Sequence, residues 1–146
     1  MKVSDWLDRY PERGVTVAPH AELDEAAKAM LDRPECRALY VVDSKGKVVG
    51  HLGFRRLAGL LLAEHRPRHT RRELVERVTH GPVSAYMDDR FVFASPDEYL
   101  DNVLHRHMER QVEDMPVVDA QGELQGVIRL ADVLRAIIED PDMLGG

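Results

Sequence analysis

Two stretches of the chain carry the same pattern: LYVVDSKGKVVGHL at residues 39–52 and MPVVDAQGELQGVI at residues 115–128. In each, an apolar run leads into Asp-x-x-Gly, and a second apolar run with another glycine follows. Corresponding residues keep one constant offset, as Asp43 with Asp119 and Gly50 with Gly126 illustrate. Because the two copies should fold alike, this repeat decides the architecture.

Each copy predicts the same order of elements. A β-prone run comes first, at residues 15–17 and 91–93, and an amphipathic helix follows. In copy two, Ser95 and Glu98 form a capping box with Pro96 at the first helical position, so the helix is expected to begin there. The hairpin comes next, and a closing helix is expected over residues 54–64 and 130–139. The sequence therefore predicts a mixed α/β (α+β) fold of tandem β-α-β-β-α repeats.

The similarity extends to the segments that lead each copy, where residues 3–8 align with residues 83–88. We expect a first repeat over residues 1–64, a linker over 65–82 and a second repeat over 83–146. Within the linker, Thr70 and Glu73 form another capping box, which predicts a short helix over 70–78. One copy of about 60 residues buries little surface by itself, so the two copies are expected to pair through their sheets.

Composition narrows the class of protein. The chain has 146 residues, of which 44% are hydrophobic and 32% charged, a balance typical of a compact domain. No apolar run reaches the length of a membrane span and no export signal is evident, so a cytoplasmic location is expected. The net charge of −6 gives no general attraction to nucleic acid. The basic stretch from Arg55 to Arg77 is interpreted as a solvated face or a contact for phosphate or an acidic partner.

Nothing in the sequence indicates an enzyme. The Gly-x-Ser-x-Gly and phosphate-loop patterns are absent, and the single cysteine, Cys36, has no activating arrangement around it. His105 and Glu109 share a helix face but His107 points elsewhere, so that face offers a metal only two ligands. His107 is expected to be partly buried. We predict neither a catalytic nor a metal site.

The strand-to-helix junction of copy two is the candidate binding site. Gly126 allows close approach of another backbone, and the helix that follows presents free N–H groups suited to an anion. Asp132 falls in the first turn of that helix. By spacing alone, its carboxylate either complements the helix dipole or accepts hydrogen bonds from a diol.

Both copies contain Pro-x-x-x-Leu followed by Val-Val-Asp-x-x-Gly-x-x-x-Gly, and copy two closes with Gly-h-h-x-x-x-Asp (h, apolar). This ordered set, spread over residues 3–139, resembles paired cystathionine-β-synthase (CBS) domains, known as a Bateman module. The resemblance implies repeats paired with pseudo-two-fold symmetry, a homodimer, and clefts between the sheets. It also implies regulatory binding of an adenosine-containing nucleotide such as AMP, ADP or ATP, with signalling to an unidentified effector protein. No cofactor is required, and whether Mg²⁺ accompanies the phosphates stays open.

The resemblance also assigns residues. Asp132 takes the position of the ribose-binding carboxylate, and Arg129 stands where a Thr or Ser hydroxyl usually meets phosphate. By the same resemblance, adenine is expected to contact five residues: Phe93, Ala94, Met115, Pro116 and Val117.

Copy one departs further from the family pattern, with Arg56 at the carboxylate position and Gly53 at the hydroxyl position. Because a guanidinium group cannot accept a hydrogen bond from ribose, one working site per chain is expected. A second cleft, if used, comprises Val17, Ala18, Tyr40, Gly53 and Arg56. The alternative function is a ligand-free dimeric scaffold whose clefts are filled by Arg129 and Arg56.

Overall fold

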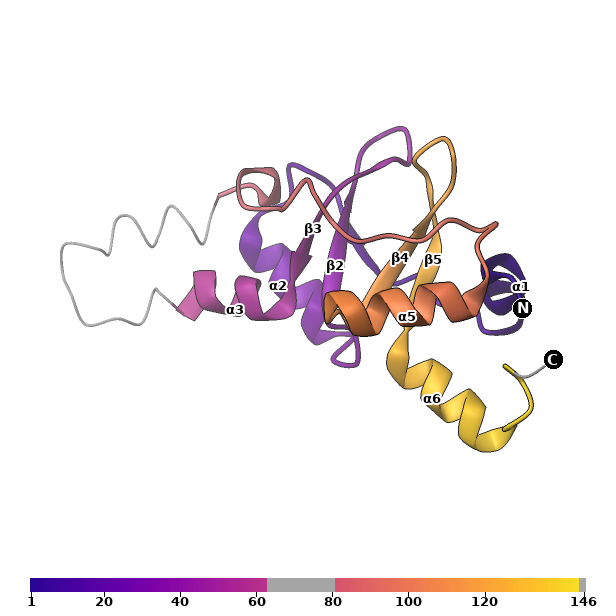
Figure 1. The fold of residues 1–146 in the computed structure, drawn as a ribbon. Helices are drawn as coiled ribbons and strands as arrows, with labels where there is room; N and C mark the ends of the chain where they lie inside the picture. Colours follow the sequence, from indigo (N-terminus) through magenta and orange to yellow (C-terminus); the bar gives the residue numbers. More distant parts are fainter. Residues whose placement is uncertain (63–80, 145–146) are drawn as a thin grey trace. The chain divides into compact units, whose positions relative to one another are not determined.

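The computed structural model describes residues 1–62 and 81–144 (Figure 1). Its contacts divide the chain into two compact units: unit 1, which is Met1–Gly14 with Val92–Gly146, and unit 2, which is Val15–Phe91. Each unit combines one hairpin with a leading segment from elsewhere in the chain. The helix predicted over residues 70–78, and the part of the basic stretch beyond residue 62, lie outside the described residues.

Unit 2 contains a three-stranded sheet with the order β1-β2-β3. β1 (Val15–Val17) runs parallel to β2 (Ala38–Val42), and β2 runs antiparallel to β3 (Val48–Gly53). The helices are α2 (Leu23–Leu31) and α3 (Phe54–Leu62), with a 3₁₀ turn, η3, at Val83–Ala85. Apolar side chains of the strands and of all three helical segments form one buried cluster.

Unit 1 repeats this arrangement, with differences in its first strand and in its leading segment. It contains α1 (Val3–Arg9), α5 (Leu100–Arg110), β4 (Asp114–Val118), β5 (Leu124–Arg129) and α6 (Leu130–Glu139). β4 and β5 are antiparallel, which confirms the predicted hairpin and the mixed α/β class. The strand predicted at residues 91–93 is wrong: only Ala94 pairs, through a single parallel bridge to Val117, where unit 2 has β1.

Both hairpin turns form as the repeat predicts. Gly46 and Gly122 adopt φ angles of 83° and 84°, a region that glycine enters without steric cost. The Asp43 Oδ1 atom accepts hydrogen bonds from the N–H groups of residues 45 and 47, and Asp119 does the same for residues 121 and 123. An aspartate that opens the turn and a glycine in it therefore set each strand register.

The helix of copy two begins at Leu100, so the predicted start at Pro96 is wrong. The carbonyl groups of Pro96 and Glu98 instead accept hydrogen bonds from the N–H groups of Ser4 and Val3, at 3.0 and 2.9 Å. Half of the capping box is present, because the Glu98 carboxylate accepts from the Ser95 N–H, at 2.9 Å, but it closes a turn rather than a helix. Pairing with the leading segment takes precedence over the local helix signal.

The same pairing occurs in unit 2. The N–H groups of Val83 and Ser84 donate to the carbonyl groups of Ala21 and Pro19, at 2.7 and 3.1 Å. This confirms the sequence alignment of the two leading segments at Val3 and Val83. The first segment forms a seven-residue α-helix, whereas the second forms only a three-residue 3₁₀ turn.

Each leading segment also reaches the edge strand of its unit beside a repeat glycine. In unit 2, His51 and Asp88 exchange two backbone hydrogen bonds of 2.9 Å, and a Cβ atom on Gly50 would lie 2.9 Å from the Asp88 carbonyl oxygen. In unit 1, the Val127 N–H donates to the Glu12 carbonyl at 2.9 Å beside Gly126. The backbones can meet only because these positions lack a side chain.

His107 is the one buried histidine of the described residues, at 1% exposure, which is more than the partial burial expected. Its Nδ1 atom lies 2.9 Å from the Val103 carbonyl oxygen and its Nε2 atom 3.0 Å from the Ile128 carbonyl oxygen. The ring therefore ties α5 to the end of β5, directly before the candidate site.

Gly50→Ala tests the close approach of the leading segment. The added methyl group would meet the Asp88 carbonyl and the Met87 side chain, so we expect the free energy of unfolding to fall by about 1–3 kcal/mol. Gly53→Ala in the same strand is the matched control, since nothing lies within 4 Å of its Cβ position. Denaturant unfolding measures both, and equal losses in the two variants would contradict the account.

A second prediction concerns pH. Burial lowers the pKa of His51, and the charge of Asp88 partly opposes this effect. Because the folded-state pKa lies below the unfolded value of about 6.5, the unfolded chain binds the proton more readily. The contribution of His51 to stability is therefore complete above about pH 6.5 and is lost as the pH falls through the folded-state pKa.

We expect His51→Gln to reduce the loss of stability between pH 7.5 and 5.5, and Asp88→Asn to enlarge it. Thermal unfolding of the three proteins across this range provides the measurement. If the stability of His51→Gln depends on pH as that of the wild type does, His51 is not the source of the pH dependence.

Candidate functional site

Asp132 lies in the first turn of α6, where the sequence places it. β5 runs directly into this helix, and Arg129 is both the last residue of the strand and the N-cap of the helix. The two Asp132 oxygens lie 3.3 and 3.4 Å from the Arg129 Nη1 atom, and Arg135 Nη1 lies 3.7 Å from the nearer one. The structure thus brings together the two residues predicted for ribose and phosphate, and pairs them with each other.

Two further carboxylates surround Arg129, whose exposure is only 9%. The strand register sets Asp114 opposite Arg129, with 4.0 Å between Asp114 Oδ1 and Arg129 Nε. Glu12 Oε1 lies 3.6 Å from Arg129 Nη1. A buried guanidinium group is costly without partners, and this one has three carboxylates within 4 Å.

A hollow of about 220 Å³ opens beside Asp132 within unit 1. The Asp132 side chain is 22% exposed, so its carboxylate is accessible from one side. Small-molecule sites usually enclose about 300–1,000 Å³, so a hollow of this size would hold part of a ligand rather than all of it. Its lining residues are Tyr10, Pro11, Glu12, Asp132, Arg135, Ala136 and Glu139.

The residues expected to hold adenine are mostly core residues. Ala94, Met115 and Val117 are fully buried in the apolar cluster of unit 1, and Pro116 is also buried. Phe93 is 52% exposed, and its carbonyl group accepts a hydrogen bond from Arg106 at 2.9 Å. The structure joins Ala94 to Val117, but none of the five lines the hollow beside Asp132. Their role toward adenine stays a prediction.

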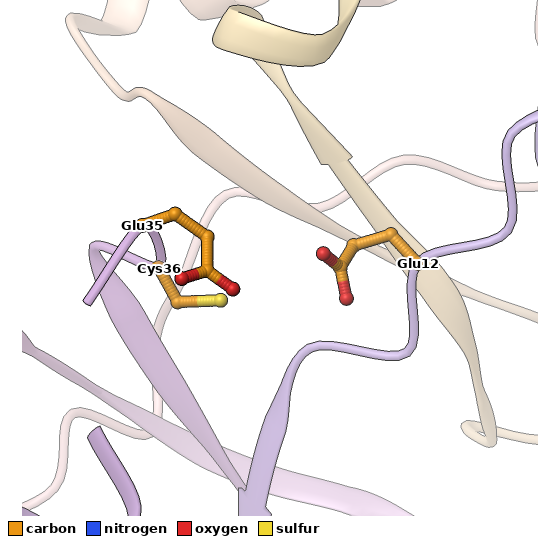
Figure 2. A group of neighbouring side chains, drawn as sticks. All are labelled: Glu12, Glu35 and Cys36. Atoms are coloured by element: carbon orange, nitrogen blue, oxygen red, sulfur yellow. The ribbon is translucent and has the colours of Figure 1, made fainter. Parts of the chain in front are cut away.

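Sequence reasoning missed the leading segment as part of this site. Tyr10 stacks on Trp6, with ring centroids 4.3 Å apart, and Glu12 follows in the coil between α1 and β1 (Figure 2). No motif marks these residues. The only sequence signal is the self-similarity of the leading segments, which indicates that they pack in equivalent ways.

The residues of the second predicted cleft lie in or directly beside β1, β2, β3 and α3 of unit 2. Tyr40 is buried in β2, while Val17, Ala18 and Gly53 are half-buried. Arg56 is exposed, and its Nε atom donates to the Tyr86 carbonyl oxygen at 3.2 Å. The lone cysteine, Cys36, is buried just before β2 (Figure 2). Among the described residues, no helix is long and apolar enough to cross a membrane.

Comparison with solved structures identifies the same architecture. A CBS-domain-containing protein from Agrobacterium tumefaciens is 26% identical, with a TM-score of 0.70 over 93% of this chain and 98% of that one. CBSX2 in complex with AMP is 21% identical, with a TM-score of 0.74 and coverages of 94% and 96%. The CBS domain pair of protein MJ0100, in complex with 5-methylthioadenosine and S-adenosyl-L-methionine, is 22% identical, with a TM-score of 0.72 and coverages of 95% and 97%.

The chain spans only part of the length of the curated relatives that it matches. An uncharacterized 17.7 kDa protein of Acidianus ambivalens is 24% identical over 127 residues, which is 84% of this chain and 66% of that protein. Inosine-5'-monophosphate dehydrogenase of Nitrosopumilus maritimus is 30% identical over 102 residues, which is 68% of this chain but only 17% of the enzyme.

The CBS domain family itself matches twice, at residues 3–63 and 83–139. These two ranges cover most of the sequence and correspond to the two copies of the repeat. The chain therefore belongs to the CBS domain family and carries a pair of its domains.

Proposed function

We propose that this chain is a regulatory module that binds an adenosine-containing ligand in unit 1, with Asp132 accepting hydrogen bonds from the ribose hydroxyls. The observation that carries the proposal is the Asp132 carboxylate, which is partly exposed, lies in the first turn of α6 and lines a hollow. Structural neighbours in complex with AMP, or with 5-methylthioadenosine and S-adenosyl-L-methionine, support the ligand class.

Ligand binding exchanges one set of hydrogen bonds for another. The bonds from Arg129 to Asp132, at 3.3 and 3.4 Å, are longer than the usual 2.7–3.2 Å for N–H···O pairs. Ribose hydroxyls can replace them, while Arg129 keeps Glu12 and Asp114 as partners. A diol that donates two hydrogen bonds to one carboxylate then provides the recognition.

Binding of the ligand acts as a signal because it shifts the population between two arrangements of the module. A ligand can favour one arrangement of the module only by binding it more tightly than the other, and a tenfold difference in affinity corresponds to about 1.4 kcal/mol. We infer that the response is read by a second copy of the chain or by a separate effector protein. In this role the chain regulates and performs no reaction of its own.

One observation favours a second candidate, a scaffold that binds no ligand. Arg129 is nearly buried and lies against Asp132, which is how a filled cleft would look. A thermal-shift screen with adenosine compounds distinguishes the two, because a ligand that binds only the folded state raises the melting temperature. The absence of any shift would favour the scaffold.

Asp132→Ala tests the ribose contact. We expect the affinity for an adenosine compound to fall by about tenfold or more, since buried hydroxyls would lose their acceptor at about 1–3 kcal/mol. Isothermal titration calorimetry of wild type and variant provides the measurement.

Asp101→Ala is the matched control, because Asp101 occupies the first turn of α5 and is exposed. It removes a carboxylate from an equivalent helix position of unit 1 without touching the hollow. Equal affinities of wild type and Asp132→Ala would remove the assignment.

A further inference from the structure

The charges beside Asp132 bear on which adenosine compound the site accepts. Among the residues that the structure describes, three carboxylates line the hollow, from Glu12, Asp132 and Glu139, against one cation, Arg135. The N-terminus of α6 favours an anion, but Asp132 in its first turn already complements that dipole. Among the lining residues, negative charge therefore predominates.

Arg129 does not reverse this balance. Its guanidinium group lies within 4 Å of Glu12, Asp114 and Asp132, so one positive charge is shared by three negative charges. At 9% exposure it also has little surface left for a new anion. A phosphate group with close to two negative charges would have to displace these carboxylates and then stay beside them, where like charges repel strongly.

We propose that this site selects adenosine derivatives that carry no phosphate: neutral ones such as adenosine, or cationic ones such as a sulfonium derivative. The inference rests on the proposed function and narrows its ligand class, against the sequence-based expectation of AMP, ADP or ATP. The carboxylates of Glu12, Asp114 and Asp132, which already neutralise Arg129, are the groups that exclude the phosphate.

The test compares affinities by isothermal titration calorimetry for adenosine, S-adenosylmethionine, AMP, and ATP with and without Mg²⁺. We expect adenosine and S-adenosylmethionine to bind at least about tenfold more tightly than AMP or ATP. Tighter binding of AMP, ATP or Mg²⁺-ATP would overturn this inference and leave the proposed function standing. Binding of none of them would refute the proposed function itself.

Glu139→Gln tests the electrostatic cause, because Glu139 is an exposed residue at the end of α6 that lines the hollow. Loss of this charge is expected to strengthen AMP binding and weaken that of S-adenosylmethionine, with adenosine unchanged. Glu109→Gln on α5 makes the same change in net charge away from the hollow and should leave all three affinities as they are. Identical effects of the two variants would refute a local cause.

Discussion

The backbone contact beside the repeat glycines is the constraint on which the candidate site depends. In unit 1, the Val127 N–H donates to the Glu12 carbonyl oxygen at 2.9 Å. The neighbouring residue is Gly126, and a side chain at this position would collide with the leading segment. This contact fixes the segment that follows α1, and with it Tyr10 and Glu12 at the hollow beside Asp132. A glycine in an edge strand thus positions site residues that lie more than a hundred positions away in the sequence.

Arg129 is a nearly buried charge at the junction of β5 and α6, held by the residues around it. Asp114, which faces it across the hairpin, and Glu12, which the leading segment supplies, compensate its buried charge. Removal of any one partner from such a cluster is costly, because a buried charge would lose its compensation. The equivalent position in unit 2 is Gly53, with open space around its Cβ position. The two copies therefore share a fold but differ in the chemistry of their junctions.

The repeat predicts the fold well, because the hairpin turns are local: Asp43 with Gly46, and Asp119 with Gly122, determine each turn through bonds within a few residues. It fails where a distant segment intervenes. The capping box at Ser95 is a genuine local signal, yet the carbonyl groups at 96 and 98 pair with the leading segment instead. The site follows the same division: the resemblance to the CBS family assigns Asp132 and Arg129, whereas Glu12 and Tyr10 reach the hollow only through tertiary contacts.

The most direct measurement is a crystal structure of the chain with a bound adenosine compound. The account predicts a ribose hydroxyl within about 3.2 Å of the Asp132 carboxylate, with Arg129 retained by Glu12 and Asp114. A ligand bound elsewhere in the chain, with Asp132 still held by Arg129, would contradict it.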